Sequence, residues 1–148
     1  MATLKVKIQE DIILDNQDYG SKRILEIASI DEVMKRIVTC AASQTTTVAV
    51  FNSNAYGAAG AVDIEDSKYI RITNLDSSNA VELAVVGAAT LYQVNLAAGQ
   101  SHILGSADGL MLSEADTSPS FGTMADLGSI QVNPGGNAVD VELFIASA

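Results

Sequence analysis

Short runs of alternating apolar and polar residues recur along this chain, and turn-forming residues separate them. The opening run, TLKVKIQE at residues 3–10, alternates from its first position. Side chains of a β-strand point to its two faces in turn, so this period indicates a strand with one face in water. The chain holds roughly eight to ten such runs, about 10–14 residues apart, which is typical of an antiparallel sandwich or barrel. That spacing leaves no room for the helices of a parallel sheet.

Residues 3–28 are predicted to form one long hairpin. The two alternating runs in this range are separated by the turn formers NQDYG at 16–20. Gly20 is the residue that we expect to take a positive φ in this turn, because glycine has no Cβ to clash there.

The next segment, SIDEVMKRIVTCAAS at 29–43, fits either a helix or a strand. Ser29 and Glu32 have the spacing of a capping box, which favours a helix. Three β-branched residues stand together at 37–39, which favours a strand. The strand is the preferred interpretation.

Two later segments, 69–85 and 129–146, share one order of features. Each has an alternating apolar run, an asparagine, a turn, the triplet Asn-Ala-Val, an acid and a leucine. We predict that each is a hairpin, and that the same unit is used twice. Hairpin edges and faces of this kind can pair with another copy of the chain.

The length and composition indicate one domain. A chain of 148 residues is long enough to bury a single core, and the lack of Trp points to an aliphatic core. We therefore predict an all-β fold: one antiparallel β-sandwich over residues 1–148, with jelly-roll or related Greek-key topology. The hairpin at about 3–28 is an element able to extend to a neighbouring subunit. The segment 107–127 is expected to be a long ordered loop, because its apolar residues need somewhere to be buried.

Charge is distributed unevenly along the chain. Eight Lys and Arg stand against eighteen Asp and Glu, for a net charge of -10. All eight basic residues lie before position 72 together with ten acids, and the remainder has eight acids and no basic residue. Binding to phosphates requires Lys and Arg, so we expect no direct nucleic-acid partner. The acidic excess serves solubility, meets a basic partner surface, or repels other copies of the chain from wrong contacts.

Targeting signals are not apparent in this sequence. The N-terminal residues alternate from the start and lack the basic region and apolar run of a secretory signal, so we expect none. Mean hydropathy is +0.25, but the apolar runs fall far short of the ~20 residues that a membrane span needs. We expect no membrane partner. Cys40 is the only cysteine, so no internal disulfide can form, and a buried thiol is its expected state.

Candidate metal ligands and catalytic groups are few. His102 is the only histidine, no G-x-S-x-G elbow accompanies it, and zinc would need carboxylates to complete its ligands. Asp15, Gly20 and Glu26 fit the first, sixth and twelfth positions of a calcium loop, but the inner positions lack oxygen ligands. The acids of DIED at 63–66 point to opposite faces if this segment is a strand. We predict no metal site.

Paired carboxylates are the remaining enzymatic possibility. Glu82, Asp140 and Glu142 recur on the two similar segments, as the acids of a glycosidase would. Carbohydrate clefts, however, usually present aromatic platforms, and the chain has four Tyr, three Phe and no Trp. We predict that the protein is not an enzyme, with no catalytic or cofactor-binding residue and no cofactor.

Three stretches carry a resemblance to a known group: YIRITNLDSSNAVELAVV at 69–86, LAAGQSHIL at 96–104 and LGSIQVNPGGNAVDVELFIASA at 127–148. Together they resemble small virion structural proteins of tailed bacteriophages, of the capsid decoration or cement type. In that group a strand ending in Ile-x-Asn, a Val-Glu-Leu strand, a Leu-x-x-Gly-x-Ser turn and a last strand near the C-terminus recur. The similarity covers about residues 33–148, as a pattern of strands and turns without an invariant motif.

The resemblance implies a jelly-roll or sandwich subunit that binds the outer capsid shell and stabilises it. Its implied partners are copies of itself, with a trimer favoured, and the major capsid protein or other virion proteins. Its implied location is the virion surface after assembly in the host cytoplasm. A tail, neck or head-fibre component is the alternative in the same class, and a stand-alone binding module for carbohydrate or protein is the alternative outside it. No functional residue is carried over.

Several segments are expected to make these contacts. The last strand, with Val141, Leu143 and Ile145, is a candidate anchor to another subunit, and the N-terminal hairpin is another. The Ala- and Gly-rich loop at 55–61 and the loop at 107–127 are expected at contacts, because small residues permit close backbone approach.

Overall fold

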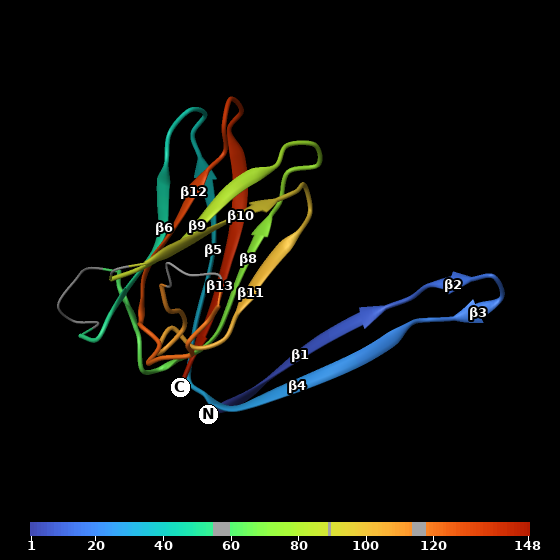
Figure 1. The fold of residues 1–148 in the computed structure, drawn as a ribbon, viewed down its shortest axis with the longest axis horizontal. Coiled ribbons are helices and arrows are strands. Elements are labelled where there is room, and N and C mark those ends of the chain that lie inside the picture. The colour runs from blue at the N-terminus through green and yellow to red at the C-terminus, as the bar shows by residue number, and fades with distance from the viewer. Residues whose placement is uncertain (55–59, 89, 114–117) are drawn as a thin grey trace.

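The computed structural model describes residues 1–54, 60–88, 90–113 and 118–148. The protein is all-β, and no helix occurs in these ranges. Two sheets face one another, and a long N-terminal arm leaves this sandwich at the end where both termini lie (Figure 1). We call that end the foot of the sandwich.

Two sheets make up the sandwich. The strands of the first sheet are β5 (Glu32–Cys40), β8 (Ser67–Asn74), β11 (Ser101–Leu104) and β13 (Val139–Ser147). The strands of the second sheet are β6 (Thr46–Asn52), β7 (Val62–Asp63), β9 (Val81–Gly87), β10 (Leu91–Leu96) and β12 (Leu127–Asn133). The strand orders are β11-β8-β13-β5 and β10-β9-β12-β6-β7. Neighbours are antiparallel except β6 and β7.

The strand order is that of a jelly roll. If β5, β6 and β8 to β13 are numbered one to eight along the chain, the first sheet reads six-three-eight-one and the second five-four-seven-two. The first and last of these strands are therefore neighbours in one sheet, as in other double-sheet jelly rolls. The predicted all-β, jelly-roll class is confirmed.

The segment at 29–43, whose sequence fits either a helix or a strand, contains strand β5. This strand pairs along its whole length with β13, from Cys40 opposite Val139 to Glu32 opposite Ser147. Packing explains why this segment is a strand despite the capping-box spacing of Ser29 and Glu32. Strand geometry turns Met34, Val38 and Cys40 toward the core, whereas a helix would lose the β13 ladder.

The prediction of two hairpins at 69–85 and 129–146 is wrong. Strands β8 and β9 lie in different sheets, and so do β12 and β13. Each segment is an arch that carries the chain from one sheet to the other. Alternation and a polar turn are common to hairpins and arches, so the local pattern does not distinguish them.

The two similar segments nevertheless have similar turns. The Asn74 side-chain oxygen accepts a hydrogen bond from the Asp76 amide at 3.0 Å, and Asn133 accepts one from Gly135 at the same distance. Asn74 is buried, and its side-chain amide nitrogen also donates to the Leu96 carbonyl at 3.1 Å. Asparagine side chains thus fix both arches by bonding the backbone two residues ahead.

The core between the sheets is largely aliphatic, as expected from the composition. Its largest fully buried side chains are Ile70, Ile72, Leu83, Leu127, Ile130, Leu143, Ile145, Val48, Val81, Val85, Val132 and Val139. The proposed role of Val141, Leu143 and Ile145 as an anchor to another subunit is therefore wrong. Strand β13 is a central strand between β8 and β5, so its inward side chains fill their own core.

The arm is the predicted N-terminal hairpin. Its long strands are β1 (Ala2–Glu10) and β4 (Ser21–Ile30), and its tip holds β2 (Ile13–Leu14) and β3 (Gln17–Asp18). The positive φ angles of the tip belong to Asp15, at 52°, and Asn16, at 63°. Two consecutive positive φ angles are typical of a type I′ turn.

Gly20 has a different role from the one that we predicted. It is not among the residues with positive φ. A Cβ at this position would lie 2.6 Å from the carbonyl oxygen of Glu10, so the close approach of two strands requires glycine here.

The loop at 107–127 is partly buried. Ala107, Met111 and Leu127 are buried, and Met111 bridges to Ala125. Phe121, in contrast, is 80% exposed with a φ of 49°, so the expectation that the apolar residues of this loop are buried fails there. Residues 55–59 and 114–117 of the two loops expected at contacts lie outside the described residues.

Candidate interaction surface

The base of the arm packs on the outer face of the first sheet. Leu4, Val6 and Ile27 of the arm are partly buried against a small cluster that contains Tyr69 of β8 and is flanked by Phe144 of β13. The Tyr69 and Phe144 rings meet edge to face with their centroids 6.0 Å apart. This second, smaller core fixes the direction in which the arm leaves the body.

The apolar face of the arm continues beyond the body. Antiparallel register places Val6 opposite Leu25 and Ile8 opposite Arg23, so these side chains share the face that is buried at the base. Leu25 is 54% exposed. An isolated two-stranded hairpin is marginally stable in water, so the outer arm lacks the support that a third strand or a packed face would give.

The tip of the arm is apolar and acidic. Ile12, Leu14 and Tyr19 share one face, since the Tyr19 amide donates to the Ile12 carbonyl at 3.0 Å and Leu14 pairs with Gln17. On the other face Ile13 is 76% exposed. Three acids flank these side chains: Asp11, Asp15 and Asp18. We call residues 11–19 the arm tip.

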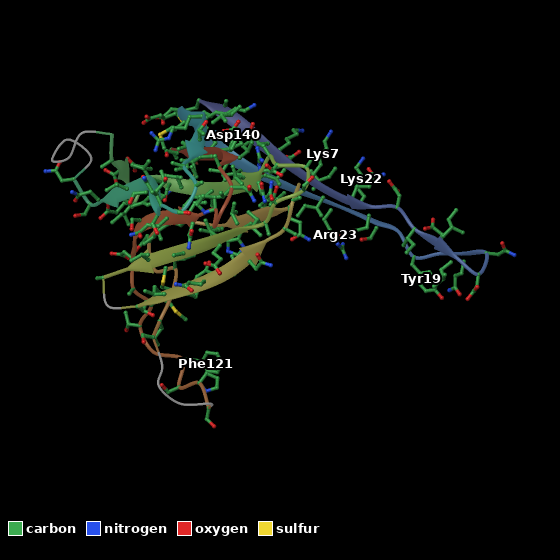
Figure 2. The ribbon with its side chains drawn as sticks, turned by 90° about the horizontal axis from the view of Figure 1, so that it is seen from above. Lys7, Tyr19, Lys22, Arg23, Phe121 and Asp140 are labelled. Carbon is green, nitrogen blue, oxygen red and sulfur yellow. The ribbon has the colours of Figure 1, made fainter. Side chains whose placement is uncertain are left out.

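The middle of the arm is basic. Lys5 is paired with Glu26 at 2.8 Å, but Lys7, Lys22 and Arg23 make no salt bridge within the described ranges. Figure 2 shows Lys22 and Arg23 on opposite sides of the ribbon. Lys7, Lys22 and Arg23 thus form a local basic region on a protein with a net charge of -10.

An apolar groove lies between the arm and the body. Its volume is about 270 Å³. Its apolar lining includes Val6, Ile8, Leu25, Tyr69, Ile103 and Leu104. The charged residues that line it, Arg23 and Lys68, are both basic. We call this feature the arm groove.

Open sheet edges flank these surfaces. Strand β5 pairs only with β13, and β11 pairs only with β8, so each leaves one row of backbone groups unpaired within the described sheets. The exposed side chains Val33 and Ile37 lie on the outer face of β5. Unpaired edges of this kind can add a strand from another chain.

The outer face of the first sheet also holds an ion-pair network. Arg71 Nη2 lies 2.6 Å from Glu142 Oε1, and Lys35 Nζ lies 3.7 Å from Glu142 Oε2. The hydrogen bond from Arg71, more than the attraction of Lys35, lowers the pKa of Glu142. The Arg71 guanidinium stands 5.7 Å from the centre of the Phe144 ring. This network is a structural contact between β8, β13 and β5.

Glu82 is separated from the other two candidate carboxylates of a glycosidase, Asp140 and Glu142, which lie on the outer face of β13. Glu142 lies on the outer face of the first sheet and Glu82 on the second sheet, where it accepts a hydrogen bond from Asn133 at 3.3 Å. Asp140 accepts a hydrogen bond from the Thr39 hydroxyl at 2.5 Å. These partners give each acid a structural contact.

The His102 side chain, on β11 of the first sheet, contacts the second sheet. Its Nε2 lies 3.0 Å from the Tyr92 hydroxyl, and burial lowers its pKa. Cys40 is buried in the core, and burial raises the pKa of its thiol. A thiol that is buried and protonated is a poor nucleophile.

The acids that were considered as metal ligands lie in different elements of the structure. Asp15 lies in the arm turn and Glu26 in β4, where Lys5 pairs with it. Asp63 accepts a hydrogen bond from the Glu65 amide at 3.0 Å. In the part of the chain that the structure describes, no group of three or more His, Cys, Asp or Glu side chains is placed to hold a metal ion. No helix there has the length and apolar character of a membrane span.

The arm groove and the arm tip were not found from the sequence. The groove forms from β1, β4, β8 and β11, which are distant in the chain, so no local pattern marks it. The tip does have a signal. Three consecutive apolar residues at 12–14 precede a turn, where exposed apolar runs are unusual.

No family model and no curated protein matches this chain. One similar solved structure comes from a description of Bacillus endospore appendages as a novel family of disulfide-linked pili. It superposes with a TM-score of 0.43 and 11% identity over 83% of this chain and 94% of the other.

Proposed function

We propose that this protein is a structural subunit of a bacteriophage virion, of the capsid decoration or cement type. In this role it binds the outer shell and stabilises it through contacts between subunits, and it catalyses no reaction. The resemblance of residues 33–148 to such virion proteins supports the assignment to a virion. Its partners are then copies of itself, as a trimer, and the major capsid protein or another virion protein.

The observation that carries the assembly part of this proposal is the outer arm. It projects from the sandwich, has apolar side chains on both faces of its tip, and pairs only with itself within the described residues (Figure 2). Exposed apolar surface of this kind marks a protein interaction site. A projecting β-arm suits a subunit whose task is contact, because it extends the reach of a small domain.

The self-association part is tested by size-exclusion chromatography with light scattering on the full chain. We expect a mass of three or more subunits at micromolar concentration. A monomer at every concentration tested would contradict the proposal. Chromatography at high salt separates charge contacts from apolar ones, because the screening length of exposed charges falls to about 3 Å at about 1 M salt.

The shell-binding part is tested by co-sedimentation with capsid shells assembled without this chain, from the phage that encodes it. We expect saturable binding at micromolar concentration and shells that withstand higher temperature. The protein centrifuged without shells is the control. Binding to isolated tails or necks in place of shells would favour the tail, neck or head-fibre alternative.

A further inference from the structure

We propose that the arm groove is occupied by the arm tip of a second copy of this chain. This inference deepens the proposed function and rests on its claim that the protein self-associates. Each chain would then present one donor, its tip, and one acceptor, its groove.

The first argument is chemical complementarity. The tip presents Ile12, Leu14 and Tyr19 on one face, with Asp15 in the adjoining turn and Asp18 beside Ile13 on the other face. The groove is apolar with Arg23 and Lys68 at its sides. Apolar surface would be removed from water on both partners, and opposite charges would meet around it.

The second argument is that the basic groove has no acid of its own. Arg23 makes no salt bridge in the described ranges, and Lys68 donates to the backbone carbonyl of Glu65 at 2.7 Å. No acidic residue lines the groove. The three acids of the tip likewise form no salt bridge with a cation of the described chain. Each surface therefore lacks the charge that the other one carries.

The third argument is that a tip cannot enter its own groove. The groove includes Ile8, while Ile12 and Leu14 of the tip lie four and six residues further along the chain. At about 3.3 Å per residue, the paired strands hold these two side chains about 13 and 20 Å from Ile8. The strands would have to separate before the tip could fold back. Only another molecule can bring a tip to this groove.

The geometry of the assembly follows from these surfaces. Tip and groove are different surfaces, so the contact is heterologous and repeats from one copy to the next. Such contacts close into a ring when the rotation permits, and the trimer of the proposed function is a ring of this kind. The body beneath the groove is a rigid sandwich, which suits an acceptor.

The test mixes two variants, each of which loses one surface. Leu14→Arg places a cation on the tip, where it meets the basic groove, and Ile103→Glu places an acid in the groove, where it meets the acidic tip. We expect each variant alone to self-associate at least about 30-fold more weakly than the native chain, because a charge is buried without a partner. Mixed in equal amounts, the two variants should form a one-to-one heterodimer, since the native tip of the Ile103→Glu chain fits the native groove of the Leu14→Arg chain.

Controls separate this contact from general effects. Leu91→Arg is the matched control, because Leu91 on β10 is 55% exposed against 57% for Leu14 and lies in the other sheet. It should associate as the native chain does. Arg23→Glu is a second groove variant, and its side chain lies on the arm outside the core. Thermal unfolding of each variant confirms that the sandwich is intact.

Two results would overturn the inference and leave the proposed function standing. One is native self-association that neither Leu14→Arg nor Ile103→Glu weakens. The other is a mixture of the two variants that fails to associate while the native chain does. A third result would also overturn the inference: the native chain is monomeric and binds shells, and both variants lose that shell binding. The groove would then be assigned to a contact with a shell protein.

Discussion

The Tyr92 hydroxyl lies 3.0 Å from Nε2 of His102, and this contact joins the two sheets at one edge of the sandwich. Tyr92 belongs to β10 and His102 to β11, which are the outer strands of the second and first sheets. The rings also meet edge to face with their centroids 5.9 Å apart. The only histidine of the chain thus has a structural partner across the sandwich.

The burial of His102 predicts a dependence of stability on pH. Burial lowers the pKa of His102, so the unfolded chain binds a proton more tightly than the folded one. The free energy of unfolding is therefore highest above the unfolded value of about 6.5, and it decreases as pH falls from there toward the lowered pKa. Urea unfolding at pH 7.5 and 5.5 measures the difference. In His102→Gln this part of the difference should disappear.

The matched control is Tyr92→Phe, which removes the hydroxyl and keeps the titrating imidazole. We expect it to cost about 0.5–1.5 kcal/mol at pH 7.5, the usual net value of one hydrogen bond. It should retain the loss of stability on acidification. A Tyr92→Phe protein whose stability no longer depends on pH in this range would assign the effect to the hydroxyl.

A second prediction concerns the ion pair between Arg71 and Glu142. Replacing Glu142 by Gln removes a charge-assisted bond on a half-buried sheet face, and we expect a cost of about 1–2 kcal/mol at pH 7. Because the hydrogen bond from Arg71 lowers the pKa of Glu142, its contribution is present above about pH 4.3 and is lost as pH falls through the folded pKa. The stabilities of native and variant proteins should therefore converge in acid, as measured by chemical denaturation.

A third prediction uses the two similar arches. Asn74→Ala removes three hydrogen bonds and leaves the carbonyls of Asn79 and Leu96 without that donor in a buried place, so we expect a cost of about 2–4 kcal/mol. Asn133→Ala, the matched position of the second arch, removes bonds in an exposed turn and should cost less than about 1 kcal/mol. Denaturation of both variants is the measurement. Equal costs would mean that burial of Asn74 does not matter.

The strands themselves were predictable, because alternation is a local property. The runs that became β8 and β13 bury every second side chain over most of their length, as the period-two pattern requires, whereas β1 partly buries only Leu4 and Val6. Which strands pair was not predictable. Residues 75–80 form a polar turn, and a turn sequence of this kind is compatible with a hairpin and with an arch. Long-range contacts decide between the two, since β8 gains β13 and β11 as partners and β9 gains β12 and β10.

The candidate surface was predictable in outline only. The N-terminal hairpin follows from alternation and turn chemistry, and its ability to reach a neighbour follows from its length. Alternation does not say whether an apolar face meets its own body or another molecule. Val6 is partly buried against the body, whereas Leu25, its register partner on the same face, is half open to water.

The last prediction tests the glycine that the arm requires. In Gly20→Ala the new Cβ would lie 2.6 Å from the Glu10 carbonyl oxygen, which is backbone and cannot move aside without shifting the pairing of Glu10 with Ser21. We expect faster amide exchange in the arm tip and self-association weakened at least about tenfold, because the tip loses its fixed position. The melting temperature of the sandwich should change by less than about 2 °C, since the tip makes no contact with the core. Gly136→Ala, in the open turn before β13, is the matched control and should change neither property. If the arm of Gly20→Ala exchanges and associates like the native one, the tip does not need its precise position to bind.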